Sequence, residues 1–241
     1  MMDIPKMIIF DYGQTLVDEK PYDILKGTEA VLLHAVENPD NVSAEEICVL
    51  STKLFGEIVK HRDLSVLEAH NHSFQNYLYD YFGIVFTISS LEIERIFEGA
   101  ASTGEPTKNI GGFLQLLSRK GIRTGVISNM SFSGSMLTER INRYMPSHAF
   151  EFIISSSEYV FRKPHKRIFE LALRKAKLEP HHVWYCGDHA ICDIDGAANC
   201  GIFPIWYKGA FEEKNTHVPT ISDYLEVNDW HELITLIEKN K

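Results

Sequence analysis

The chain has 241 residues, of which 44% are hydrophobic and 24% are charged. This is the composition of a folded globular protein, and the length suffices for one large domain or two unequal ones. The net charge of −9 leaves no broad cationic surface, which argues against nucleic acid as a partner.

The cellular location is predicted from two absences. No apolar run approaches the roughly 20 residues that a membrane-spanning helix needs, and residues 1–6 lack the cationic and apolar segments of a signal peptide. We therefore expect a cytoplasmic protein that does not bind a membrane. Cys48, Cys186, Cys192 and Cys200 lack the Cys-x-x-Cys spacing, and we interpret all four as structural thiols.

Five short apolar runs predict buried strands. They cover residues 6–10, 122–127, 150–154, 182–186 and 202–206. Helical patterns of apolar residues separate the later runs, at residues 112–121, 136–145, 166–178 and 193–201. Alternation of strands and helices predicts an α/β fold with a doubly wound parallel sheet, whose ligand sites lie beyond the carboxyl ends of the strands. Pro204, inside the last run, favours a position at the sheet edge.

Residues 18–103 interrupt this alternation. They are helical in character and carry few strand signals, so we expect a helical domain inserted into an α/β core made of residues 1–17 and 104–241. Within the insert, aromatic and leucine side chains recur at helical spacing and predict its packed core. These side chains are Phe74, Tyr77, Leu78, Tyr81 and Phe82.

Polar motifs close the predicted strands and follow one another in a fixed order. The motifs are Asp11-Tyr12-Gly13-Gln14-Thr15-Leu16, Ser128-Asn129, Arg162-Lys163-Pro164, and Gly187-Asp188 with Asp193 five residues later. Their order and separation resemble the four signatures of the haloacid dehalogenase superfamily of hydrolases. The resemblance covers residues 7–16 and about 110–207, whereas the insert matches only in position and helical character. It implies a Rossmann-like core with an inserted cap domain.

The residues of these motifs meet the demands of phosphoryl transfer, which are a nucleophile, charge neutralisation and oriented donors. Asp11 is positioned to attack phosphorus and form an aspartyl phosphate, which water then hydrolyses. A carboxylate ~3.5 Å from a phosphate dianion feels a repulsion of roughly 9 kcal/mol at an effective dielectric near 20, so counter-charge is required. The resemblance implies that Lys163 contacts both Asp11 and the phosphate, and that Ser128 and Asn129 bind the substrate at its phosphate oxygens.

A metal site is predicted beside the nucleophile. Asp188 and Asp193 offer hard oxygen ligands that suit Mg²⁺. The resemblance implies that Asp11, Asp188 and the Gly13 carbonyl bind the ion directly, and that Asp193 acts through water or through a neighbouring ligand. Three carboxylates, one Mg²⁺ and the Lys163 ammonium carry no net charge together, which would let the site accept a phosphate.

Gly13 departs from the phosphatase pattern, because most phosphatases of the family carry a second aspartate at this position that acts as general acid and base. Such assistance is worth roughly 10²- to 10⁴-fold in rate. Glycine retains the carbonyl that would bind the metal. His189 is the first candidate for a replacement acid, and Asp18 and Glu19 are the others.

Three other functions stay open at this point. A phosphonoacetaldehyde hydrolase would use an insert lysine as a Schiff base, for which Lys26, Lys53 and Lys60 are available. A haloacid dehalogenase would work without metal, which the acidic pair argues against. A non-catalytic member would bind a phosphate ligand or a protein without turnover. The expected function is hydrolysis of a small phosphorylated metabolite by a monomer or homodimer.

Overall fold

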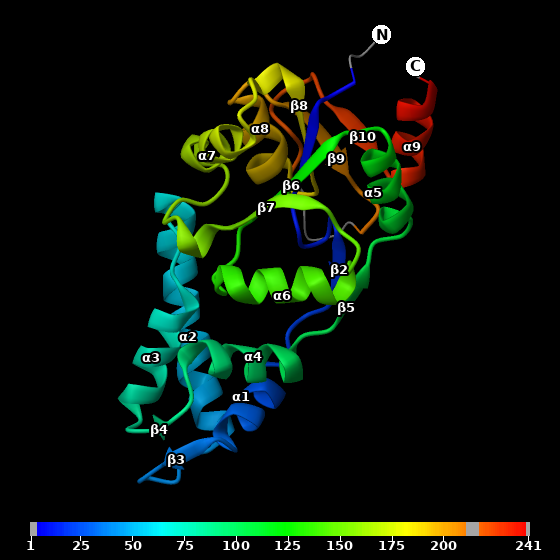
Figure 1. Cartoon of the computed structure of the whole chain (residues 1–241). Helices are drawn as coiled ribbons and strands as arrows, with labels where there is room; N and C mark the ends of the chain where they lie inside the picture. Colours follow the sequence, from blue (N-terminus) through cyan, green and yellow to red (C-terminus); the bar gives the residue numbers. More distant parts are fainter. Residues whose placement is uncertain (1–3, 211–216, 240–241) are drawn as a thin grey trace.

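A computed structural model describes residues 4–210 and 217–239 of the chain. Figure 1 shows a lobe built around one sheet and, below it, a lobe of helices α1 to α4. The sheet has six strands in the order β10-β9-β8-β1-β6-β7, and every neighbouring pair is parallel. The strands are β1 (Met7–Phe10), β6 (Arg123–Ser128), β7 (Phe150–Ser155), β8 (Val183–Gly187), β9 (Phe203–Tyr207) and β10 (Leu225–Val227). The predicted α/β fold with a doubly wound parallel sheet is confirmed.

Helices cover both faces of this sheet. Alternate residues of a strand point to opposite faces, so Ile8 and Phe10 of β1 pack with one group of helices, and Met7 and Ile9 pack with the other. The first group is α5 (Ile110–Arg119), α6 (Gly134–Tyr144) and α9 (Trp230–Lys239), and the second is α7 (Lys166–Ala176) and α8 (Gly196–Ala198). A π-helix, Ala190–Asp195, precedes α8, and short 3-10 helices span Ser156–Glu158 and Pro180–His182.

The prediction that Pro204 marks a sheet edge is wrong for the strand as a whole. Strand β9 lies second from the edge, between β8 and β10. However, β10 pairs only with Ile205, Trp206 and Tyr207, so the outer side of Pro204 has no strand beside it. The missing N–H of proline therefore costs no ladder hydrogen bond on that side.

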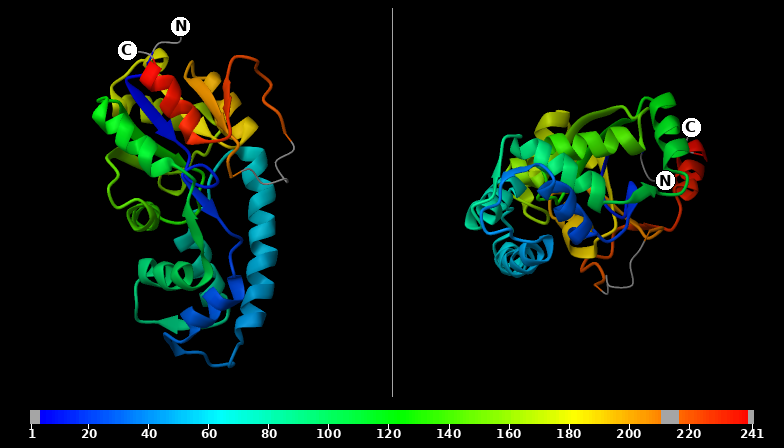
Figure 2. Two further views of the ribbon diagram at one scale, coloured as in Figure 1. Left: turned by 90° about the vertical axis from the view of Figure 1, so that its right-hand side faces the viewer. Right: turned by 90° about the horizontal axis from the view of Figure 1, so that it is seen from below.

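The inserted segment leaves and re-enters the core through an antiparallel pair, β2 (Val17–Glu19) and β5 (Gly104–Pro106). Between them lie four helices and a second small pair, β3 (Ala35–Glu37) with β4 (Val85–Phe86). The helices are α1 (Ile24–Leu32), α2 (Ala44–Ser65), α3 (Asn71–Tyr81) and α4 (Ser90–Ala101). The left view of Figure 2 shows α2 in cyan, running from the far end of the insert up to the sheet-containing lobe. No helix of the described ranges is both long and apolar enough to cross a bilayer.

The predicted core of the insert is only partly correct. Leu78 is buried, at 5% exposure, and Phe74 and Phe82 pack against the same core, whereas Tyr77 and Tyr81 are 56% and 63% exposed. Tyr77 and Tyr81 are four residues apart on α3, so their rings stack on each other on its outer face. Helical spacing marks which residues share a face, but the neighbouring helices decide which face is covered.

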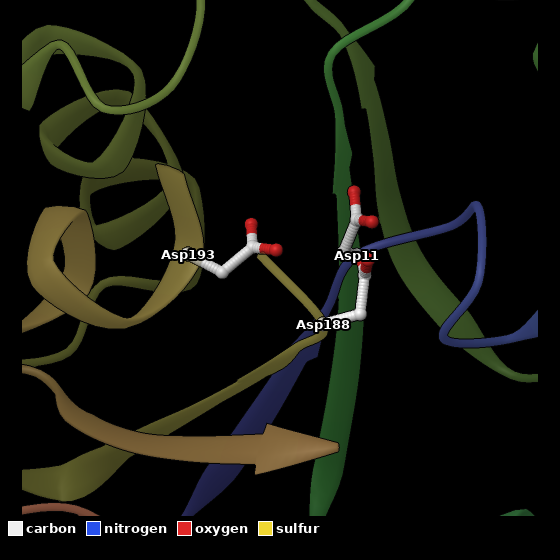
Figure 3. Close-up of side chains that lie close together, drawn as sticks. All are labelled: Asp11, Asp188 and Asp193. Carbon is white, nitrogen blue, oxygen red and sulfur yellow. The ribbon is translucent and has the colours of Figure 1, made fainter. Parts of the chain in front are cut away.

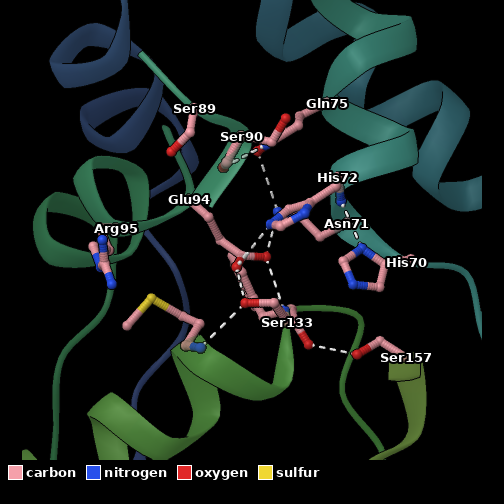
Figure 4. Close-up of polar contacts among 12 residues, drawn as sticks. His70, Asn71, His72, Gln75, Ser89, Ser90, Glu94, Arg95, Ser133 and Ser157 are labelled. Atoms are coloured by element: carbon pink, nitrogen blue, oxygen red, sulfur yellow. Dashed lines mark hydrogen bonds and ion pairs between the residues drawn. The ribbon is translucent and has the colours of Figure 1, made fainter. Parts of the chain in front are cut away.

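A buried carboxylate of the insert ties it to the core. Glu94 of α4 accepts hydrogen bonds from the Ser133 backbone N–H at 3.0 Å and from its hydroxyl at 2.5 Å, at the start of α6. From within the insert, Asn71 donates to it at 3.0 Å and His72 lies 3.3 Å away (Figure 4). Glu94 thus satisfies donors of the core helix and of the insert at once.

Replacement of Glu94 by leucine leaves the N–H and hydroxyl donors of the buried Ser133 without their acceptor. Each such loss costs about 1–3 kcal/mol, so we expect Glu94→Leu to lower the free energy of unfolding by at least this amount. The measurement is urea unfolding, with Glu92→Leu as the control, because Glu92 lies on the exposed face of the same helix. An equal effect of the two variants would contradict the role of Glu94.

Candidate active site

The residues predicted to carry chemistry meet at one edge of the sheet. Asp11 follows β1, Ser128 ends β6 and Asp188 follows β8, and β1 lies between the other two strands. After β1 the chain builds the sheet outward to β7 on one side, and then returns to build β8, β9 and β10 on the other. The order of strands therefore reverses beside β1, which is where open α/β sheets bind their ligands.

The loop after β1 holds Asp11 in place through its backbone. The Asp11 N–H donates to the Cys186 carbonyl at 2.8 Å, which continues the pairing with β8. The Tyr12 carbonyl then accepts from the N–H groups of Leu16 and Val17, and Gln14 adopts a φ of 54° inside the resulting turn. The Asp11 carboxylate consequently lies at the carboxyl end of a rigid, buried strand.

Lys163 joins the acidic residues of the site. Its Nζ lies 2.6 Å from Asp11 Oδ1, 2.5 Å from Asp193 Oδ1 and 2.8 Å from the Tyr185 hydroxyl. The backbone of Lys163 is fixed by Asn129, whose side chain accepts from its N–H at 2.7 Å and donates to its carbonyl at 2.9 Å. Both ends of the Asn129 amide are thus used to position the lysine.

Three carboxylates form one cluster, which Figure 3 shows converging from separate segments. Oxygen atoms of Asp11, Asp188 and Asp193 lie within 4.8 Å of one another. Thr15 donates to Asp188 at 3.4 Å, and the Trp206 indole donates to the Asp188 carbonyl at 2.7 Å. Asp193 uses one oxygen for Lys163 and accepts the His189 N–H with the other at 2.9 Å.

The same residues surround a cavity of about 580 Å³. Core residues on its wall include Asp11, Ser128, Lys163 and Asp188, and the insert contributes Arg62, Asp63 and Val66 from the end of α2. The insert therefore forms part of the cavity wall. Sequence reasoning did not place Arg62 here, because it is distant in sequence from every motif.

Comparison with known proteins agrees with this geometry. Residues 5–201 match the profile of the haloacid dehalogenase-like hydrolases. The chain belongs to this family. Its resemblance to the family in motif order is thereby confirmed over most of its length.

Three curated relatives carry the same name, glyceraldehyde 3-phosphate phosphatase. The protein of Pyrococcus furiosus is 29% identical over 126 residues, which are 51% of this chain and 50% of the relative. That of Methanothermobacter thermautotrophicus is 37% identical over 102 residues, or 42% and 43% of the two chains. The chain thus matches about half the length of these relatives or less.

Solved structures show the family fold over nearly the whole chain. A 2-haloacid dehalogenase from Pseudomonas syringae superposes with a TM-score of 0.63 at 20% identity, covering 98% of this chain and 99% of the other. A haloacid dehalogenase family phosphatase from Thermococcus onnurineus gives 0.61 at 17% identity, covering 96% and 97%. Both a dehalogenase and a phosphatase share the fold, so the fold alone does not select the reaction.

Burial and charge repulsion shift the pKa values of the cluster. Burial raises the pKa of Asp11 to about 6, with Asp193 acting in the same direction and Lys163 opposing them. Burial, together with Asp193 and Asp11, raises the pKa of Asp188 well above its usual range. Burial alone would lower the pKa of Lys163, but its ion pairs with Asp11 and Asp193 outweigh burial and hold it above its usual value. The cluster is therefore short of positive charge.

The donor set of the cluster fits a hard divalent cation. All three side chains are carboxylates, and such cations prefer oxygen ligands. A cation would offset the burial of these carboxylates and the repulsion among them, which together raise the pKa values of Asp11 and Asp188. Gly13 also lines the cavity, which leaves its carbonyl a candidate ligand.

Gly13 has no side chain, and another residue occupies the space that a side chain would fill at this position. A Cβ atom built on Gly13 would lie 2.6 Å from Oε2 of Glu19. Asp18, the neighbouring candidate, instead pairs with Lys20 at 2.8 Å and is 32% exposed at its side chain. His189 lines the cavity on the Asp193 side, and its Nδ1 accepts from the Cys192 N–H at 3.1 Å.

Glu19 is held by a buried arginine that sequence reasoning missed. Arg140 of α6 has no exposed surface, and it forms ion pairs with Glu19 and, at 3.2 Å, with Glu98. It also donates to the Tyr22 hydroxyl at 2.5 Å, and its guanidinium lies over the Tyr12 ring. The sequence did not indicate that Arg140 is buried. Arginine is rarely buried unless it is paired, so an arginine on an amphipathic helix of the core is expected at the surface.

The insert lysines lie away from the cavity. Lys26 on α1 and Lys53 and Lys60 on α2 are all exposed, and none of the three lines the cavity that holds Asp11. A Schiff-base lysine has to reach the substrate beside the nucleophile, which none of the three does from these positions. The structure therefore provides no support for the phosphonoacetaldehyde hydrolase alternative.

Lys163 is predicted to be essential for stability as well as for the site. In Lys163→Met, Asp11 and Asp193 lose their buried counter-charge, which costs about 3–5 kcal/mol at neutral pH. Unpaired buried carboxylates have pKa values in the folded state that lie above those in the unfolded chain. The variant protein therefore keeps its stability at low pH and loses it as the pH rises through the folded-state pKa. The deficit measured by urea unfolding should thus be larger at pH 7.5 than at pH 5.

The control for this prediction is Lys166→Met, because the Lys166 side chain is 70% exposed. It should leave the free energy of unfolding nearly unchanged at both pH values. A deficit in Lys163→Met that does not depend on pH would indicate lost packing rather than lost charge.

Proposed function

We propose that this hydrolase is a Mg²⁺-dependent phosphatase that acts on a small phosphorylated metabolite through an aspartyl phosphate on Asp11. The observation that carries the proposal is the buried Lys163 ammonium, which contacts Asp11 and Asp193 inside a cluster of three carboxylates. Such a site combines a nucleophile with the positive charge that an anionic substrate needs. A phosphate ester is the substrate whose charge this arrangement balances.

The residues of the chain divide the work of the reaction. One oxygen of Asp11 receives the Lys163 hydrogen bond, which orients the carboxylate for attack on phosphorus by the other. Lys163 also offsets the negative charge that builds up on the phosphoryl oxygens, and Ser128 donates to one of them. Asn129 acts through Lys163, because its amide is bound to the lysine backbone on both sides.

Mg²⁺ would be held by Asp11, Asp188 and the Gly13 carbonyl. When bound, it supplies further positive charge to the phosphate and to the attacking carboxylate. Asp193 would act beside the ion rather than on it, since its two oxygens already accept hydrogen bonds from Lys163 and from His189 N–H. The three carboxylates, the Mg²⁺ ion and the Lys163 ammonium would together carry no net charge before substrate binds.

The substrate is proposed to be small. The cavity of about 580 Å³ is of the size of a metabolite site, and residues 18–103 would act as a cap that closes one side of it. The three curated relatives are named for glyceraldehyde 3-phosphate, which makes triose phosphates the first substrates to test.

The metal site can be tested without turnover. In the presence of chelator, Asp188→Asn should melt at a higher temperature than the wild type, because it removes a buried charge that Asp11 and Asp193 repel. A gain on the order of 1 kcal/mol corresponds to roughly 2–4 °C in a protein of this size. Addition of Mg²⁺ should stabilise the wild type and leave Asp188→Asn unchanged, as measured by differential scanning fluorimetry.

Asp18→Asn is the matched control for this test. Asp18 is also an aspartate but lies outside the carboxylate cluster, so the variant should keep the Mg²⁺-dependent rise in melting temperature. Equal stabilisation of Asp188→Asn and wild type by Mg²⁺ would place the ion elsewhere.

The reaction itself is tested by phosphate release from a panel of triose phosphates, sugar phosphates and nucleoside monophosphates. We expect Mg²⁺-dependent release by the wild type, and a loss of at least about 10³-fold in Asp11→Asn, because an amide is a far poorer nucleophile than a carboxylate. Halide release from a 2-haloacid is measured in parallel. Halide release without phosphate release would instead support a dehalogenase.

A third result would point to a binding protein. If neither product appears, while Mg²⁺ still stabilises the wild type and inorganic phosphate stabilises it further, the chain binds a phosphate ligand without turnover. Gly13 is the feature that would then explain the loss of catalysis.

A further inference from the structure

We propose that the Glu19 carboxyl group serves as the general acid and base that the first motif lacks at Gly13. The inference rests on the proposed phosphatase function and names the residue that completes it. It concerns a residue eight positions after the nucleophile, outside the motif itself.

The first argument is the position of the carboxylate. Among the described residues, and apart from the chain neighbours of Gly13, the atoms within 4 Å of a Cβ built on Gly13 are Oε2 of Glu19, at 2.6 Å, and its Cδ, at 3.6 Å. An aspartate at position 13 would thus extend into space that the Glu19 carboxylate already fills. Glu19 also lines the cavity that contains Asp11, Lys163 and Asp188.

The second argument explains why this residue reaches the site. Strand β2 pairs with β5 directly after the loop, and Gly13 bridges to Val17. Alternate residues of a strand share a face, so Glu19 lies on the same face as the fully buried Val17, and Asp18 points the other way. Asp18 accordingly pairs with Lys20, away from the cavity wall.

The third argument is that Glu19 is anchored. Arg140 binds its Oε1, which leaves Oε2 as the oxygen beside Gly13. The guanidinium is itself fixed by Glu98, Ser102 and Tyr22. A carboxylate held on one oxygen has the other available at a defined place, as a group that transfers protons must.

Glu19 would donate a proton in the first half-reaction and accept one in the second. In the first half-reaction, an Asp11 oxygen bonds to phosphorus as the ester P–O bond breaks, and the Glu19 carboxyl gives its proton to the leaving oxygen to form an alcohol. In the second, the Glu19 carboxylate takes a proton from water as the water oxygen bonds to phosphorus. The P–O bond to Asp11 then breaks, which releases phosphate and returns Glu19 to its protonated form.

The test compares Glu19→Gln with Glu98→Gln, on an ester with a poor leaving group, glycerol phosphate, and one with a good leaving group, p-nitrophenyl phosphate. Both variants remove a charge that pairs with Arg140, but Glu98 lies outside the cavity. Alcohol release in the first turnover is measured by rapid mixing with Mg²⁺-loaded protein. Asp11→Asn is run beside them to verify the proposed function.

We expect Glu19→Gln to slow the first turnover of glycerol phosphate by about 10²-fold or more, and that of p-nitrophenyl phosphate by less than about 10-fold, because a good leaving group needs no proton. Since the second half-reaction loses its base, p-nitrophenol should appear as a burst of about one equivalent followed by slow turnover. Glu98→Gln should show neither the leaving-group dependence nor the burst.

A compensating variant guards against misfolding of Glu19→Gln. Glu19→Ala combined with Gly13→Asp places a carboxyl group in the vacated space, and it should recover glycerol phosphate hydrolysis relative to Glu19→Ala alone. Gly13→Asp by itself meets the Glu19 carboxylate and should lower the rate.

Two results would overturn the proposal and are distinguishable. Equal slowing of both esters by Glu19→Gln, or the same leaving-group pattern in Glu98→Gln, would show that Glu19 acts only through Arg140, with the phosphatase function intact. If Asp11→Asn still turns over the esters, or if the wild type does not, the proposed function is refuted and this inference with it.

Discussion

The site depends on one buried interaction, the contact of the Lys163 ammonium with Asp11 and Asp193. Three carboxylates within 4.8 Å of one another repel, and burial makes the repulsion larger. Lys163 opposes this effect at Asp11 and Asp188, but the pKa values of both stay raised, mainly because the groups are buried and in part because their neighbours repel them. A cation bound among the three carboxylates would offset both their burial and their repulsion.

Much of the surrounding structure serves to hold this lysine in place. Asn129 fixes its backbone from β6, and the Tyr185 hydroxyl binds its ammonium from β8. The parallel sheet makes this possible, because the carboxyl ends of β6, β1 and β8 lie side by side. Residues from distant segments thereby meet at one edge of the sheet, and the segment between β7 and α7 brings Lys163 to them.

The junction between core and insert lies directly beside the chemistry. The loop that carries Asp11 runs without interruption into β2, and β2 is where the insert begins. Glu19 therefore lies both at this junction and in the cavity wall, and the end of α2 adds Arg62 to that wall. Interactions such as Glu94 with Ser133 fix how the insert rests on the core, and so they set the shape of the substrate space.

The sequence by itself determined the parallel α/β core, the helical insert and the ordered acidic and lysine motifs, because strand periodicity and the residues after each strand are local features. Tertiary structure alone decided which groups stand around the site. The direction of Glu19 toward Gly13 follows from the pairing of β2 with β5, and the Tyr185 hydroxyl gains its role only when Lys163 arrives from another segment. Likewise, the exposure of Tyr77 and Tyr81 depends on which face of α3 its neighbours cover. Spacing along the chain determines which side chains share a face of a helix or strand. Which residues pack against that face depends on the neighbouring elements, and these come together only in the tertiary structure.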